Sequence, residues 1–371
     1  MRHINYYFLS VVIILAVFGT LFLSTLSSVS SLNLFGNTNY YLIRHLVRIA
    51  IGLVLCFIFL KLPLYFLKKI ALVALIANLV ILIAVFFVGE NFGGAFRWIS
   101  IGDITFQPAE FLKITSILYL SALLSNKLKE TGRRGWSFSI KKSYYNFVHV
   151  FLPFLALLAA ISVILILQPD ISTLGIITIT LLAVYFAAGT PLWHTIATVL
   201  AGIGGAALLV YFKQYRFDRF LVFLNPDTAP LGIGWQIKQS LIAIGSGGIF
   251  GKGLGMSAQK FGFLPEAMSD SVFAILGEET GIIGTTGLIL LFILFLWLGI
   301  KIARKANDKF SKLTAVGITF LITFQAFLNI TSTIGLFPIS GLPLPFFSYG
   351  GSHIIAELIG VGILLNISKN G

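Results

Sequence analysis

The chain has few charged residues for its length. Asp, Glu, Lys and Arg make up only 11% of its 371 residues, whereas soluble domains carry about a quarter. Hydrophobic residues reach 57%, and the mean hydropathy is +0.97. This composition excludes an ordinary soluble domain, because most of the surface has to be apolar. The solvent for most of the chain is therefore lipid.

Cysteine and histidine are also scarce. The single cysteine, Cys56, lies in an apolar run, so the sequence contains no disulfide framework. The five histidines fall in separate segments without the spacing of metal ligands, which argues against a dedicated zinc site. These are His3, His45, His149, His194 and His353.

Two widespread catalytic motifs are missing. No Gly-x-Ser-x-Gly elbow occurs. The glycine-rich stretch Gly245–Gly255 fails as a phosphate loop, because Ser246 stands where its first glycine belongs and Gly253 follows Lys252 where Ser or Thr is needed. The stretch indicates a tightly turning loop that carries one cation.

Ten apolar runs are long enough, or nearly so, to cross a bilayer as helices. Uninterrupted runs in lipid favour helices, and no strand-like alternation suggests a barrel. We therefore expect an all-α, polytopic membrane protein of about ten transmembrane helices, with residues 1–371 forming one domain. The second run extends back through Arg44 and Arg48. The runs are Phe8–Ser28, Leu46–Leu60, Ile70–Val88, Pro108–Leu124, Val148–Leu167, Ile171–Ala188, Leu192–Phe212, Val272–Ile300, Leu313–Leu336 and Ser348–Ile367.

Basic residues gather in alternate loops. With the N-terminus inside, sixteen of the 26 basic residues lie on the cytoplasmic side, and the positive-inside rule then places both termini in the cytoplasm. The net charge of +13 is explained by anionic lipid headgroups, and no basic patch with interleaved aromatics indicates nucleic acid. The sixteen are Arg2, Lys61, Lys68, Lys69, Lys127, Lys129, Arg133, Arg134, Lys141, Lys142, Lys301, Arg304, Lys305, Lys309, Lys312 and Lys369.

Acidic residues show the opposite bias, since only Glu130 and Asp308 of the 13 lie in those cytoplasmic loops. Two causes remain open: simple electrostatic balance on the outer face, or a carboxylate-bearing site there. The long outer loop Lys213–Ser271, between helices seven and eight, is rich in Gly, Pro and charge. A loop of this length is typically functional, and its apolar stretches predict short amphipathic helices on the outer membrane surface.

Two outer segments carry polar residues at helix starts. In RWISIGDITFQPAEFLK (Arg97–Lys113), Glu110 and Lys113 share a helix face as an expected ion pair, and Trp98 suits an interface anchor. In LQPDIST (Leu167–Thr173), Asp170 is placed to cap the next helix. An ion pair, an interface anchor and a helix cap are structural roles, and they would explain these residues without any function in catalysis or binding.

The run FLPEAMSDSVFAILGEETG (Phe263–Gly281) is the strongest constellation, because it places Glu266 and Asp270 where the outer loop enters helix eight. A carboxylate at this boundary is expected to have a raised pKa and to suit a general base. The alternative is that Asp270 only caps the helix. At least one of Glu278 and Glu279 is expected to face a protein or water-filled interior.

Taken together, five runs resemble the SEDS family of membrane proteins (shape, elongation, division and sporulation), represented by FtsW and RodA. They occur in the family's order over essentially the whole chain, and the run from Gly251 to Ala267 is more similar to the FtsW branch. The runs are RWISIGDITFQPAEFLK, QPDIST, GWQIKQSLIAIGSGGIFGKGLG, LPEAMSDSVFAILGEETGIIG and GLPLPFFSYGGS.

The resemblance implies a peptidoglycan glycosyltransferase that polymerises lipid II on the outer face of the cytoplasmic membrane, in cell division. Asp270 matches the family's essential aspartate, implied to be the general base on the acceptor 4-hydroxyl, with a lipid pyrophosphate as the leaving group. Also implied are a divalent cation (Mg²⁺ or Mn²⁺), a class B penicillin-binding transpeptidase and other division proteins. With Glu266 as a second catalytic residue, the expected substrate contacts are Arg97, Trp98, Glu110, Lys113, Asp170, Arg216, Arg219, Lys238 and Lys252.

Three positions depart from the family pattern. The family usually has His and Thr where this chain has Met268 and Ser269, and commonly Ser where Ala109 stands. Met268 removes a titratable neighbour of the expected base. Two other functions also fit the sequence: a lipid II flippase that uses intramembrane charges, and a non-catalytic scaffold for division enzymes.

Overall fold

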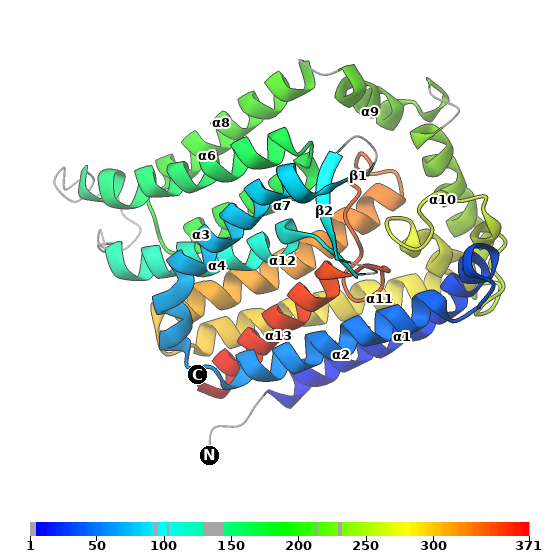
Figure 1. The fold of residues 1–371 in the computed structure, drawn as a ribbon, viewed down its shortest axis with the longest axis horizontal. Coiled ribbons are helices and arrows are strands. Elements are labelled where there is room, and N and C mark those ends of the chain that lie inside the picture. Colours follow the sequence, from blue (N-terminus) through cyan, green and yellow to red (C-terminus); the bar gives the residue numbers. More distant parts are fainter. Residues whose placement is uncertain are drawn as a thin grey trace.

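The fold comes from a computed structural model that describes residues 5–92, 95–101, 104–128, 144–211, 214–228 and 232–370. Some side chains within these ranges, including that of Arg216, lie outside the description. Helices dominate the chain (Figure 1). Their bounds are α1 Tyr6–Phe35, α2 Tyr40–Lys61, α3 Leu64–Val88, α4 Pro108–Lys127, α6 Leu152–Leu167, α7 Ile171–Ala187, α8 Leu192–Tyr211, α9 Gln214–Leu224, α10 Ile233–Gly247, α11 Val272–Lys305, α12 Lys309–Thr333 and α13 Ser352–Asn370.

Each of the ten apolar runs falls on a helix. A π-helical turn, Phe147–Phe151, precedes α6, and the tenth run begins four residues before α13 because the Pro- and Gly-rich segment ahead of it cannot stay helical. Among the described residues, seven helices are long and apolar enough to cross a membrane, and α7 and α8 are shorter apolar helices. The total of ten spans stays a prediction.

A small antiparallel sheet connects α3 to α4, and the all-α prediction missed it. Strand β2 (Ala95–Ile101) pairs with β1 (Glu90–Phe92) and with β3 (Ile104–Phe106). Ile101 and Ile104 are partners in the sheet, and the sequence between them is Gly-Asp, a dipeptide typical of hairpins. The Gly-Asp dipeptide indicates a hairpin, but the strands beside it are too short to be recognised next to the long apolar runs.

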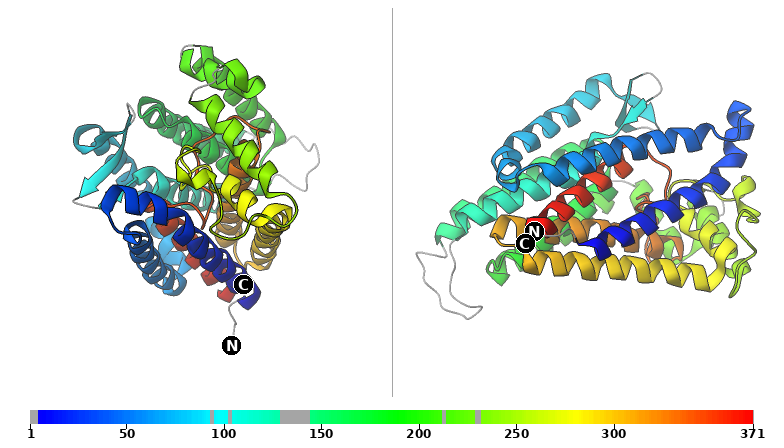
Figure 2. Two further views of the ribbon diagram at one scale, coloured as in Figure 1. Left: turned by 90° about the vertical axis from the view of Figure 1, so that its right-hand side faces the viewer. Right: turned by 90° about the horizontal axis from the view of Figure 1, so that it is seen from below.

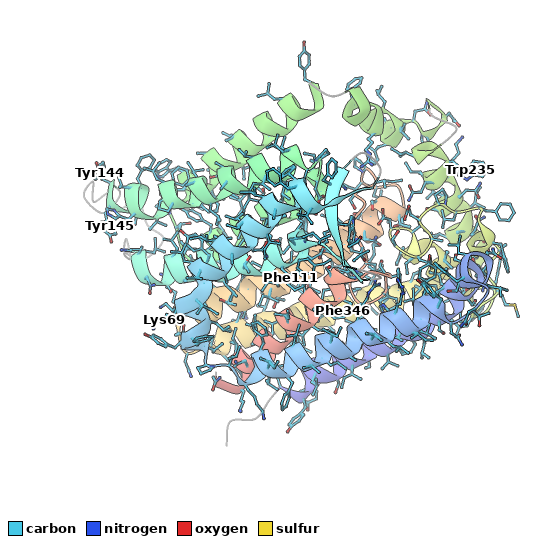
Figure 3. The ribbon with its side chains drawn as sticks, viewed as in Figure 1. Lys69, Phe111, Tyr144, Tyr145, Trp235 and Phe346 are labelled. Atoms are coloured by element: carbon cyan, nitrogen blue, oxygen red, sulfur yellow. The ribbon has the colours of Figure 1, made fainter. Side chains whose placement is uncertain are left out.

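Both chain ends lie at one end of the helix bundle, with the Lys-terminated ends of α2, α4 and α11. The backbone N–H of Asn5 donates to Ser368 Oγ at 3.4 Å, and Asn366 Nδ2 donates to the carbonyl of Leu62 at 2.6 Å. Helices α9 and α10 lie at the opposite end (Figures 1 and 2). Figure 3 shows the same separation, with Lys69 at one end and Trp235 at the other. We call these the basic end and the loop end.

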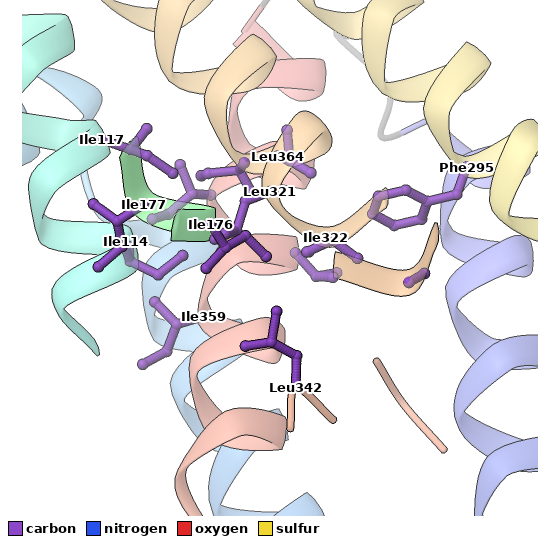
Figure 4. Close-up of a cluster of buried hydrophobic side chains, with 14 of the residues drawn as sticks. Ile114, Ile117, Ile176, Ile177, Phe295, Leu321, Ile322, Leu342, Ile359 and Leu364 are labelled. Carbon is purple, nitrogen blue, oxygen red and sulfur yellow. The ribbon is translucent and has the colours of Figure 1, made fainter. Parts of the chain in front are cut away.

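The two C-terminal helices form the centre of the bundle. In α13, 83% of the apolar window is buried, against 17% in α2, which faces outward. Isoleucine and leucine side chains from α4, α7, α12 and α13 meet in the core (Figure 4). Gly317 permits this approach, because a Cβ there would lie 2.6 Å from Ile117 Cγ2. The closely packed bundle therefore gives the loop end a rigid support.

Candidate active site

Asp270 lies at the loop end, two residues before α11 begins. It lines a cavity of about 10 Å³, which holds roughly one water molecule. The remaining walls come mainly from α10, α12 and the segment after α12. They are largely polar and include Gln236, Ser240, Asn329, Ser332, Thr333 and Ser340. A carboxylate in such a pocket has polar neighbours but little bulk water.

The backbone around Asp270 is held from three sides. Asn329 Nδ2, on α12, donates to the Asp270 carbonyl at 2.9 Å. Gln236 Nε2, on α10, donates to Ser271 Oγ at 3.0 Å, and the N–H of Tyr349 donates to the Met268 carbonyl at 2.7 Å. These contacts fix the position of the carboxylate, as catalysis requires.

The capping alternative for Asp270 is not supported. Helix α11 begins at Val272 with Ser271 as its N-cap residue, and no side-chain capping bond is present there. Within the described residues, the Asp270 carboxylate accepts no hydrogen bond from the first turn of α11. The side chain is therefore available for another role.

Electrostatics tune the same carboxyl group. The pKa of Asp270 is raised from 3.8 to about 6: burial is the largest cause, the negative charge of Glu266 adds to it, and the positive charge of Arg219 on α9 opposes both. A carboxylate with a pKa near 6 is a stronger proton acceptor than an ordinary aspartate, and it is still ionised at neutral pH.

Glu266 lies in a tight turn four residues before Asp270. Its φ of +50° is in the left-handed region, which is costly for a residue with a side chain. Its carbonyl accepts from the N–H groups of Ser269 and Ser271, both at 3.1 Å, and Ser269 Oγ donates to Glu266 Oε2 at 2.6 Å. Glu266 lines a second cavity of about 400 Å³, which shares no lining residue with the first.

Glu278 and Glu279 of α11 hold the loop to the bundle. Both are buried, which confirms that they face a protein interior. Glu278 Oε1 accepts from Lys252 Nζ at 2.7 Å, and the Glu279 carboxylate accepts from the Gly255 N–H at 2.9 Å and lies 3.8 Å from Lys260 Nζ. We call residues 251–262, held in this way, the clamped loop.

Glycine makes the close contact in the clamped loop possible. Gly251 has a φ of +79°, and a Cβ there would lie 2.2 Å from the Glu279 carbonyl oxygen. The glycine-rich stretch is therefore a helix-docking turn, in line with the tight turn expected from the sequence. The structure places Lys252 in an ion pair with Glu278, so its expected contact with substrate stays a prediction.

The hairpin and the start of α7 form a second polar group. Asp170 caps α7, as predicted, because Thr173 N–H donates to its Oδ1 at 3.3 Å. Arg97 Nε donates to the Gln168 carbonyl at 3.1 Å, and its NH2 atom donates to the Pro169 carbonyl. Trp98 is half-buried on β2. Arg97 and Asp170 therefore serve one turn, and their expected roles toward substrate stay predictions.

The expected ion pair in α4 is confirmed. Lys113 Nζ lies 2.8 Å and 2.9 Å from the two Glu110 carboxylate oxygens, and both side chains are buried. Lys113 also donates to Gln325 Oε1 at 2.9 Å, and Gln325 Nε2 donates to the Pro343 carbonyl at 3.0 Å. The pair thus connects α4 through α12 to the segment before α13.

The four predicted outer cations end up in different places. Arg219 acts on the pKa of Asp270, and Lys238 pairs with Asp227 on the surface. Lys252 pairs with Glu278, and the side chain of Arg216 lies outside the described residues. Only Arg219 is therefore shown close enough to Asp270 to influence it.

A resident metal site finds little support in the ligand types. In the part of the chain that the structure describes, no group of three His, Cys, Asp or Glu side chains could hold a metal ion. Mg²⁺, however, needs only one or two carboxylates when substrate phosphates supply further oxygens. The carboxylate of Asp270 or of Glu266 fits that smaller requirement only singly, because the two residues line separate cavities.

Three residues that hold the backbone around Asp270 were not predicted from the sequence. Gln236, Asn329 and Tyr349 contact the segment Met268–Ser271 from positions 35 to 81 residues away along the chain. They belong to no catalytic spacing, and Asn329 looks like one more residue of an apolar helix. Only Gln236 and Tyr349 lay in runs that resemble the SEDS family.

A family model described as "Cell cycle protein", FtsW/RodA/SpoVE, matches residues 5–371. This chain belongs to that family. It is 40% identical over 291 residues to "Stage V sporulation protein E" of Bacillus subtilis, covering 78% of this chain and 76% of the relative. It is 36% identical over 359 residues to "Probable peptidoglycan glycosyltransferase FtsW" of Coxiella burnetii, covering 95% and 93% of the two chains.

Two solved structures share the SEDS fold described here. A chain from "Structural coordination of polymerization and crosslinking by a peptidoglycan synthase complex" matches with a TM-score of 0.78 at 25% identity, covering 99% of this chain and 98% of the other. Rod shape determining protein RodA of Thermus thermophilus matches with a TM-score of 0.69 at 25% identity, covering 98% and 96%. The predicted SEDS family and its helical membrane fold are confirmed.

Proposed function

We propose that this chain is a peptidoglycan glycosyltransferase that polymerises lipid II at the outer face of the cytoplasmic membrane. The observation that carries the proposal is Asp270, a half-buried carboxylate with a raised pKa in a polar pocket at the loop end. The named activity of the FtsW relatives supports the same reaction.

In this proposal Asp270 is the general base. Its carboxylate takes the proton from the acceptor sugar's 4-hydroxyl as the oxygen bonds to the donor's anomeric carbon, and the bond to the lipid pyrophosphate breaks. Pyrophosphate is a good leaving group, so no second carboxylic acid is required. Arg219 offsets the developing negative charge. A divalent cation, Mg²⁺ or Mn²⁺, also belongs to the proposal, as a counter-ion that the pyrophosphate oxygens would largely hold.

The fold and the relatives support a wider setting for this activity. We place the basic end in the cytoplasm, with both termini, and the loop end outside, with ten helices crossing the cytoplasmic membrane in one domain. The structural match to a peptidoglycan synthase complex supports a class B penicillin-binding transpeptidase as partner. The relatives named FtsW favour a role in cell division. In that role the chain would also work with other division proteins.

Purified protein in lipid vesicles tests the activity. With a cognate transpeptidase and Mg²⁺ or Mn²⁺, we expect labelled lipid II to become glycan chains that a muramidase digests. A vesicle assay for movement of labelled lipid II across the bilayer gives the control. Translocation without polymerisation would instead establish the flippase, and neither activity in protein that still binds its partner would favour the scaffold.

The two charges beside Asp270 predict opposite pH shifts. The active base is deprotonated, so activity should rise as pH increases through about 6. Glu266→Gln removes a neighbouring negative charge and should lower the midpoint, while Arg219→Gln removes a positive charge and should raise it. We expect shifts of about 0.5–1 pH unit, because charges near a surface are partly screened. The measurement is the pH dependence of the initial polymerisation rate.

The matched control for those variants is Asp227→Asn, which removes an exposed carboxylate paired with Lys238. Its pH midpoint should stay at the wild-type value. Shifts of the same sign in Glu266→Gln and Arg219→Gln, or an equal shift in the control, would contradict the assignment of Asp270 as the titrating base.

A further inference from the structure

The proposed general base, Asp270, gives no role to the cavity of about 400 Å³ at the loop end, because Asp270 does not line it. That volume is within the range of small-molecule sites, and the walls of the cavity come from four separate parts of the chain. The end of α1 contributes Asn33, the start of α2 contributes Tyr41, the segment before α11 contributes Glu266 and Met268, and the segment before α13 contributes Tyr349.

We propose that this cavity is a saccharide subsite, which holds a neutral N-acetylated sugar of the lipid-linked glycan next to the reacting unit. The inference rests on the proposed function, because it assigns part of that substrate to a place on the protein. Ser269 lines the cavity and directly precedes Asp270, and Glu266 on the cavity wall acts electrostatically on Asp270, so the cavity and the base belong to the same short segment.

The charge of the cavity selects a sugar over a pyrophosphate. Among the described residues that line it, Lys260 is the one cation, and its side chain is only 6% exposed. Lys260 Nζ donates to the Gly255 carbonyl and lies 3.8 Å from Glu279. Glu266, by contrast, is exposed at the wall. The two lining charges cancel, but Lys260 is already committed to Gly255 and Glu279, so the charge that a ligand meets at the wall is the Glu266 carboxylate. That carboxylate repels an anionic group and accepts hydrogen bonds from the hydroxyls of a sugar ring.

The aromatic residues suit the flat faces of a sugar ring. Tyr41 and Tyr349 pack edge to face, with ring centroids 5.0 Å apart, and both are half-buried. The guanidinium of Arg48 lies 5.0 Å from the Tyr349 ring centroid and supports that ring. Within the described residues neither tyrosine hydroxyl has a hydrogen-bond partner, so both remain available to a ligand. Asn33 adds an exposed carboxamide for an acetamido group.

The cavity is also preorganised. Lys260 belongs to the clamped loop, which the buried carboxylates of Glu278 and Glu279 hold on α11. The N–H of Tyr349 donates to the Met268 carbonyl at 2.7 Å, which joins two walls to each other. A rigid site loses little conformational entropy when a ligand binds, which favours binding of an uncharged ligand such as a neutral saccharide.

Cysteine protection tests the subsite without any turnover. In a Cys56→Ala background, Met268→Cys places the only thiol on the cavity wall, and Leu254→Cys gives a matched control that is 70% exposed on the clamped loop but does not line the cavity. Full-length protein in vesicles is labelled with a membrane-impermeant maleimide. We expect di-N-acetylchitobiose to slow labelling at position 268 at least three-fold, with no effect at 254 and none from inorganic pyrophosphate.

A kinetic test separates this proposal from the reaction itself. Tyr41→Ala and Asn33→Ala should raise the KM for lipid II several-fold with little change in kcat, in protein whose Tm matches wild type. Active wild-type protein without sugar protection, or protection by pyrophosphate only, overturns the subsite alone. Sugar protection in protein that never polymerises lipid II would leave the subsite standing and overturn the proposed function.

Discussion

Replacing Asp270 with asparagine is expected to reduce glycan polymerisation by about 10²–10⁴-fold, the usual contribution of a positioned general base. Asparagine keeps the size and polarity of the side chain, so it fits the pocket formed by Gln236 and Asn329 but accepts no proton. The measurement is the initial rate of lipid II consumption with saturating transpeptidase. Residual activity should lose the rise with pH near 6 that the wild type shows.

The same variant should be at least as stable as the wild type. Because burial raises the folded-state pKa of Asp270 from 3.8 to about 6, ionisation of the carboxyl costs stability, and this cost grows as pH rises from about 4 to 6. A neutral amide avoids it. The gain at neutral pH is at most about 3 kcal/mol, since one pKa unit corresponds to about 1.4 kcal/mol. The thermal midpoint in detergent at pH 7.5 and at pH 4 measures it.

Asp170→Asn is the matched comparison, because Asp170 is a buried carboxylate that caps α7. It should lower the thermal midpoint, since the amide is a weaker partner for the helix end. An Asp270→Asn protein that polymerises lipid II at the wild-type rate would remove the proposed base. An inactive Asp270→Asn protein that has also lost its thermal transition would point to a structural role instead.

The sequence was sufficient to predict the helices and the place of the candidate base. Apolar runs in lipid leave little choice except a helix, and each of the ten runs lies largely on a helix. The position of Asp270 at the entry to α11 followed from the end of a polar loop and the start of an apolar run. Local composition determines both features, and neither depends on tertiary contacts.

Long-range contacts account for what the sequence did not predict. The contact of Asn329 with Asp270 spans 59 residues, and no periodic pattern marks it. The partner of Lys252 is a second example, because a glycine-rich loop with one lysine suggested a free cation. In the fold the Lys252 ammonium pairs with Glu278 on the next helix. The cavity beside Glu266 is built by four distant segments, so no local pattern predicts it.

Replacing Glu279 with alanine is expected to produce the largest loss of stability. Lys260 would keep its charge in a site that is only 6% exposed, and the N–H groups of Gly255 and Ser257 would lose their acceptor. Removing one partner of a buried ion pair typically costs about 3–5 kcal/mol. We expect a lower thermal midpoint and rapid amide hydrogen exchange across the clamped loop, with slow exchange preserved in α12 and α13.

Two further variants determine whether buried charge is the cause. Asp227→Ala breaks an exposed ion pair, whose side chains are 39% and 78% exposed, and should cost no more than about 1 kcal/mol. Adding Lys260→Met to Glu279→Ala removes the uncompensated ammonium and should restore part of the lost stability. If the double variant is no more stable than Glu279→Ala, the clamp depends on the backbone hydrogen bonds and not on the ion pair. An unchanged exchange rate in the clamped loop of Glu279→Ala would show that the two carboxylates do not hold it.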